Sequence, residues 1–176
     1  MKSALTTFGT GVLAACFAAC LWAADDASWT ADTAARSGKA AAAYLDGRMT
    51  WWMGWPQAAR DRETFCVSCH TVLPYAMGRP ALRTALHEEA PSATERKLLD
   101  NVTRRVRMWN ELAPFYSDEK AGAAKTAESR GTESILNAVI LAGYDVPTGK
   151  LGPDARLALE NMWGQQLKTG DARGAW

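Results

Sequence analysis

Residues 65–71, with the sequence FCVSCHT, constrain this chain more than any other stretch. They place two thiols, Cys66 and Cys69, three positions apart, and an imidazole, His70, directly after the second thiol. The other cysteines of the 176-residue chain, Cys16 and Cys20, lie near its N-terminus. A fold for this sequence therefore has to present two thiols and one imidazole within about one turn of chain.

The first 24 residues differ from all that follow. Lys2 is the only charge before Asp25, and the run between them is rich in alanine and leucine. A basic start, a short apolar stretch and small residues at its end predict a cleaved export signal over residues 1–24. Residues 13–16, LAAC, also resemble a bacterial lipobox, which would leave Cys16 lipidated. A single membrane anchor is a third interpretation, because the run is barely long enough to cross a bilayer.

The export signal predicts a periplasmic protein, or one tethered on the periplasmic side of a bacterial membrane. Contact with the membrane is expected only through the leader or a lipid anchor. Residues 25–176 would then be the exported body, in which Cys66 and Cys69 are the only cysteines.

Composition narrows the function classes. Twenty basic residues nearly balance nineteen acidic ones, so no basic excess indicates nucleic acid as a partner. The sequence also lacks the glycine-rich nucleotide-binding motifs and the HExxH pattern of zinc proteases.

The body is predicted to be all-α, because no stretch after residue 30 sustains the alternation of a strand. Ser92 and Glu95 form a capping box at the start of one helix, and Gly143 is placed to end another. Apolar faces are expected to include Val139 on the third helix and Trp163 on the last. We predict helices over residues 30–52, 92–112, 128–143 and 153–167, the last two forming a helical hairpin.

Cys-x-x-Cys-His is the attachment pattern of c-type haem. Two thiols one turn apart can bond the two vinyl groups of one porphyrin, and the next residue can place an imidazole on the iron. Cys66 and Cys69 would tether one haem c, and His70 would be the proximal iron ligand. Three alternatives stay open: a plain disulfide, a thioredoxin-like dithiol, and a zinc site that recruits His87.

The sixth iron ligand is less constrained. Met53 and Met108 are the candidates, Met53 because it lies in an aromatic stretch and Met108 because it lies on the capped helix. Met77 follows His70 too closely to reach the opposite face of a haem, and His87 lies in a charged, loop-like stretch. Each methionine is also an ordinary core residue type.

Two further groups have a functional and a structural interpretation. The arginines 104, 105 and 107 would pair with haem propionates or form a solvated helix face. The tryptophans 51, 52 and 55 would pack on the porphyrin or simply belong to the core.

Two parts of the sequence resemble known protein families. Residues 66–70 resemble the haem site of the cytochrome c superfamily, which implies roles for Cys66, Cys69 and His70 alone. Residues 165–170 and 174–176 resemble a repeat motif of squalene-hopene cyclase-like proteins, the α/α-toroid terpenoid cyclases, and residues 44–52 resemble a degraded copy. The acidic Asp-x-Asp-Asp motif of the cyclases is absent, so cyclase activity is not assigned.

The resemblance implies a haem segment joined to the start of a toroid, and we expect the chain to be the N-terminal part of a longer protein. The preferred function is an exported monohaem cytochrome that passes single electrons to an unknown redox protein and is not itself an enzyme. The alternatives are a haem-based sensor with an open sixth position, and a disulfide-stapled helical module for interactions.

Overall fold

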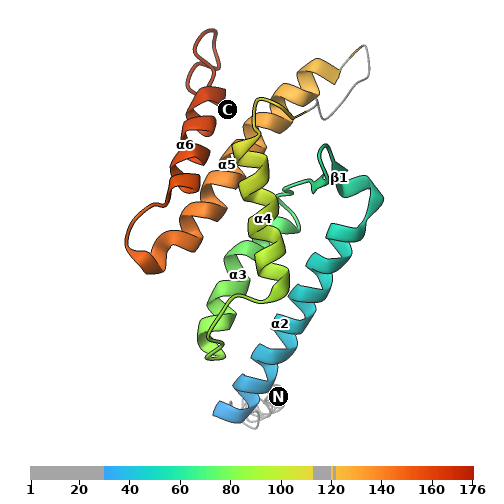
Figure 1. Cartoon of the computed structure of the whole chain (residues 1–176), viewed down its shortest axis with the longest axis vertical. Helices are drawn as coiled ribbons and strands as arrows, with labels where there is room; N and C mark the ends of the chain where they lie inside the picture. Colours follow the sequence, from blue (N-terminus) through green and yellow to red (C-terminus); the bar gives the residue numbers. More distant parts are fainter. Residues whose placement is uncertain (1–29, 113–119, 121) are drawn as a thin grey trace, which may run out of the picture. The chain divides into compact units, whose positions relative to one another are not determined.

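The computed structural model describes residues 30–112, 120 and 122–176 (Figure 1). The predicted export signal and the lipidation of Cys16 fall outside these residues. The chain divides into two compact units, residues 1–37 and 38–176. Of the first unit, residues 30–37 are described, and they include the start of one helix that continues into the second unit. All other described elements lie in the second unit.

The described chain is mostly helical, which confirms the all-α prediction at that level. Among the described helices, none combines the length and the apolar character needed to cross a membrane. The helices are α2 (Ala31–Gly54), α3 (Val72–Ala85), α4 (Ala93–Arg107), α5 (Gly122–Asp145) and α6 (Pro153–Gln165), with short 3-10 turns η1 (Pro56–Ala58) and η2 (Val146–Thr148).

A small antiparallel hairpin precedes the cysteine motif. Strand β1 (Ala59–Arg60) pairs with β2 (Thr64–Phe65), so that Ala59 faces Phe65 and Arg60 faces Thr64. The turn between them holds Arg62 and Glu63 at positive φ. The expectation of a body without strands was wrong here, because two residues per strand are too few to produce a period of two in the sequence.

Helix α3 follows the cysteine motif directly and was not predicted. Pro74 lies in the first turn of α3, where backbone N–H groups have no acceptor within the helix, so proline there breaks no helical hydrogen bond. Pro80 lies inside the helix, where proline is normally unfavourable. Burial of Val72, Tyr75 and Ala76 against the core keeps this segment helical despite Pro80.

Helix α4 begins as the capping box predicts. The Ser92 hydroxyl accepts from the Glu95 backbone N–H at 3.1 Å, and the Glu95 carboxylate accepts from the Ser92 N–H at 2.8 Å. The helix ends at Arg107, five residues before the predicted end, and Met108 is its C-terminal cap.

Helices α5 and α6 form the predicted hairpin (Figure 1). Gly143 does not end α5, which continues to Asp145; the left-handed residue is Gly149, at φ 71° after η2. Pro153 occupies the first turn of α6, as expected. Val139 and Trp163 were placed on apolar faces, but their side chains are 40% and 55% exposed.

The core of the second unit draws on every helix. Met49 of α2, Leu98 and Val102 of α4, Ile140 of α5 and Ala158 of α6 all lie in one buried cluster. Val67, a spacer residue of the cysteine motif, belongs to the same cluster and is 3% exposed. The motif is therefore anchored in the core rather than carried on a free loop.

A partly buried polar network joins α2, α3, α4 and α5. Arg79, almost fully buried, contacts Asp46 at 3.3 Å and Glu88 at 2.8 Å. Tyr75 donates to Asp46 at 2.6 Å, and Tyr144 donates to the buried Glu95 at 3.2 Å. Burial, reinforced by these carboxylates, raises the pKa of both tyrosines because a phenolate there would be desolvated and repelled.

Above about pH 10 we expect the free energy of unfolding to fall as pH rises. Tyrosines of the unfolded chain lose their protons near pH 10, whereas Tyr75 and Tyr144 keep theirs to higher pH in the fold. The folded state then binds more protons, so each rise in pH favours unfolding. Urea denaturation across this range measures the slope. A Tyr75→Phe/Tyr144→Phe variant should show a flatter dependence, and an equal slope would contradict this account.

Candidate functional site

The cysteine motif lies between β2 and α3, in a segment without regular structure. The order strand, Cys-x-x-Cys, helix is shared with thioredoxin-like dithiols. The strands here are antiparallel and two residues long, and no βαβ unit occurs in the described chain. The hairpin therefore positions the motif without making it a thioredoxin site.

The backbone at the start of the motif is held from three sides. The Cys66 N–H donates to the Ala58 carbonyl at 2.7 Å, and the Cys66 carbonyl accepts from the Trp52 indole N–H at 2.8 Å. The Asn101 side chain accepts from the Phe65 N–H at 2.8 Å and donates to the Phe65 carbonyl at 3.1 Å. Elements α2, η1 and α4 thus fix the chain at the first thiol.

The two spacer residues of the motif have distinct structural roles. Val67 is buried in the core. The Ser68 hydroxyl accepts from the N–H groups of Thr71 at 3.1 Å and Val72 at 3.4 Å, and the Ser68 carbonyl accepts from Leu73 at 3.0 Å. The first N–H groups of any helix have no acceptor within the helix itself, and at the start of α3 Ser68 supplies acceptors for them.

The second half of the motif is open to solvent. Cys69 and His70 are both exposed, and the Cys69 sulfur lies 3.0 Å from His70 Nδ1. Cys66 is half-buried, and neither thiol forms a disulfide in the structure. The structure thus brings the three predicted site residues together on one short loop.

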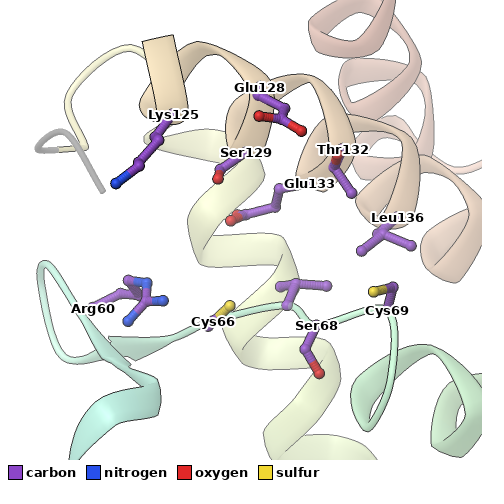
Figure 2. Close-up of a pocket in the computed structure, with 11 residues that line it drawn as sticks. Arg60, Cys66, Ser68, Cys69, Lys125, Glu128, Ser129, Thr132, Glu133 and Leu136 are labelled. Carbon is purple, nitrogen blue, oxygen red and sulfur yellow. The ribbon is translucent and has the colours of Figure 1, made fainter. Parts of the chain in front are cut away.

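Both thiols line one cavity of about 550 Å³ between the motif and α5 (Figure 2). Arg60 and Lys125 lie at one end of the cavity, whereas Cys69 and Leu136 lie at the other, with Cys66 between them. The α5 side also presents Glu128, Ser129, Thr132 and Glu133. His70 is not among the lining residues.

A buried ion pair forms part of this cavity wall. Arg105 of α4 donates to both carboxylate oxygens of Glu133, at 2.5 and 3.0 Å, and to the Thr64 hydroxyl at 2.6 Å. Arg105 is fully buried, and the Glu133 side chain is 3% exposed. Burial raises the pKa of the nearby Cys66 thiol, and the positive charge of Arg60 partly opposes this.

The expectation that the arginines 104, 105 and 107 form a solvated face or hold propionates is wrong for Arg105. Its side chain points into the core and is neutralised by Glu133. A signal was present in the sequence: position 105 is seven residues after Leu98 and three after Val102, so it falls on the apolar stripe of α4. A charge on such a stripe predicts a buried partner.

Helix α4 supplies a matched pair for testing this ion pair. Arg107 contacts Asp154 through the same two-pronged geometry, at 2.7 and 2.9 Å, but its side chain is 63% exposed. Arg105→Met should lower the free energy of unfolding by about 3–5 kcal/mol, because Glu133 is left buried and unpaired. Arg107→Met should change it little, because Arg107 is exposed and water still reaches the partly exposed Asp154 carboxylate. Urea denaturation measures both, and equal losses would contradict the assignment.

The proposed sixth ligands are not brought to this cavity. Met53 lines a separate cavity of about 290 Å³ with Phe65 and Asn101, and Met108 caps α4 beside another cavity. Met77 is 55% exposed, and His87 is exposed at φ 56°. The structure therefore places neither Met53 nor Met108 opposite the thiols, and ligation by either one stays a prediction.

The tryptophans 51, 52 and 55 form one cluster on α2 and its end, with ring centroids 5.4 to 6.4 Å apart. Trp52 packs against the core, while Trp51 is 47% exposed and lies under the Arg48 guanidinium. None of the three lines the cavity at the cysteines. Their contribution to the site is the hydrogen bond from Trp52 to Cys66.

The residues that resemble a cyclase repeat fold back on α6. Gln166 Nε2 donates to the Gly174 carbonyl at 2.9 Å, and the Trp176 indole donates to the Met162 carbonyl at 2.7 Å. The Trp176 ring also contacts that of Trp163. The relation to an α/α toroid stays a prediction.

Comparison with models of protein families, with curated proteins and with solved structures found no match. Within the described ranges, no three His, Cys, Asp or Glu side chains gather as a metal site, so the zinc interpretation gains no support.

Proposed function

We propose that Cys66 and Cys69 bind one haem covalently, that His70 is its proximal iron ligand, and that the protein is an exported carrier of single electrons. The observation that carries the proposal is that both thiols of a Cys-x-x-Cys-His motif line one cavity of about 550 Å³. That volume lies within the range of cofactor pockets. The partner would be another redox protein.

The residues present fit such a group. The motif supplies two thiols and an exposed imidazole on one loop, and the hydrogen bonds around Phe65 and Cys66 fix where the loop begins. Each thiol would add across one vinyl group, with sulfur bonding one carbon and hydrogen the other, so no oxidant is required. The bound haem would supply one-electron chemistry at its iron.

The chain's own side chains divide the cavity by polarity. Arg60 and Lys125 supply positive charge at one end, where the carboxylates of a haem would be stabilised. Val67 and Leu136 supply apolar surface. The two thioether bonds from Cys66 and Cys69 would hold the group in place in either oxidation state of its iron.

The proposal is tested by covalent retention. The full chain is exported together with cytochrome c maturation machinery, denatured and extracted with acidified acetone, and the spectrum of the remaining polypeptide is recorded. We expect haem to stay on the wild-type chain and to be lost from Cys66→Ala/Cys69→Ala. Complete extraction from the wild type would overturn the proposal.

That outcome would leave the disulfide and dithiol alternatives. The 3.0 Å contact between Cys69 and His70 favours the dithiol alternative, because an adjacent imidazole is a common partner of reactive thiols. Mass spectrometry of the alkylated chain then separates a Cys66–Cys69 disulfide from two free thiols.

A second candidate function is a haem-based binder of small ligands with an open sixth position. It is favoured by one observation: among the described residues, no methionine lines the cavity at the cysteines, and the neighbouring His70 is already assigned as the proximal ligand. A protein that closes its iron with methionine or histidine needs such a side chain there.

The spectrum of the native haem protein separates the two functions. For an open position, we expect a high-spin ferrous spectrum that changes on addition of carbon monoxide, in the wild type and equally in Met53→Leu and Met108→Leu. A low-spin spectrum converted to high-spin by one of these substitutions would identify that methionine as the ligand and support the electron carrier. Met77→Leu, at an exposed methionine, is the control.

A further inference from the structure

We propose that Trp52 is a positioning residue for the first thioether, because its indole holds the Cys66 carbonyl and thereby fixes the Cys66 thiol on the cavity wall. The inference rests on the proposed function where it concerns the attachment of haem. The positioning of Cys66 by Trp52 concerns the polypeptide alone and can be tested without haem.

The two thiols differ in how firmly their backbone is held. At Cys66, both the N–H and the carbonyl are bonded to groups outside the motif, at 2.7 Å to Ala58 and 2.8 Å to Trp52. The second bond spans fourteen residues and comes from a different element, helix α2. The exposed Cys69 forms a hydrogen bond through its side chain with its neighbour His70, within the motif itself.

Trp52 is itself immobilised, as a positioning group must be. Its ring packs against the buried core and against Trp51 and Trp55, at centroid distances of 6.4 and 5.4 Å. A rigid donor restricts rotation of the peptide that follows Cys66. The Cys66 side chain is thereby kept on the side that faces α5 (Figure 2).

A role in the core alone predicts something different. If Trp52 only filled space, replacing it would loosen the whole unit, and replacing its cluster partner Trp55 would raise the exposure of Cys66 in a similar way. If its N–H positions Cys66, the change should be local to Cys66. Trp55 provides the matched control. It shares the cluster, but among the described residues the side chain that donates to the Cys66 carbonyl is Trp52 and not Trp55.

The experiment measures alkylation of each thiol in the full chain prepared without haem, by peptide-resolved mass spectrometry after timed exposure to iodoacetamide. In Trp52→Phe, we expect Cys66 to react about fivefold faster than in wild type, the change that loss of one hydrogen bond of typical strength permits. Cys69 should keep its rate. In Trp55→Phe, both rates should stay at the wild-type values.

Trp52→Phe also shrinks a packed ring, so a second variant isolates the N–H. Trp52→benzothienylalanine keeps the ring size and replaces the N–H with sulfur. The same selective rise at Cys66 supports the proposal. An unchanged Cys66 rate in this variant, or an equal rise at Cys69, would overturn it.

The effect of Trp52 on the attachment of haem is measured separately. After export with the maturation machinery, Trp52→Phe should yield an increased share of chains joined to haem through Cys69 alone, detected as a peptide with free Cys66. If wild-type protein retains no haem, the proposed function fails while the alkylation result still decides the role of Trp52. If wild type and variant are equally doubly bonded, the positioning role in attachment is overturned.

Discussion

The buried contact of Arg105 with Glu133 and Thr64 is the interaction on which the site depends. It joins α4, α5 and β2 at one point, and all three groups lie inside the fold. Glu133 belongs to the cavity wall and Thr64 to the strand that leads to Cys66. Because an isolated charge of either sign would be unfavourable there, the pair fixes the spacing between α5 and the cysteine loop.

The loop itself is built as an extension of the core. Val67 is buried between the two thiols, Asn101 pairs with both backbone groups of Phe65, and Ser68 satisfies N–H groups that begin α3. These contacts order the first half of the motif and leave Cys69 and His70 exposed. A rigid first half and an open second half are the features on which the proposed attachment of a haem relies.

The prediction of helices succeeded where the signal was local. The capping box at Ser92 and the proline at the start of α6 act within one turn, so their residues specify those helix starts without help from the rest of the chain. Helix α3 was missed because Pro80 opposes a helix locally, and only the burial of Tyr75 and its neighbours outweighs it. The sequence could not show whether Met53 or Met108 lies near the cysteine motif, because an axial ligand is defined by its distance from the iron in three dimensions.

The sequence by itself determined the chemistry available: two thiols and an imidazole at fixed spacing, in a chain of mostly helical pattern. Those properties depend on covalent order and on local periodicity. The tertiary structure alone decided that both thiols line one cavity, that α5 forms its opposite wall, and that Trp52 and Asn101 hold the loop. Such contacts join residues from fourteen to many more positions apart, and only the packing of helices around a common core brings them together.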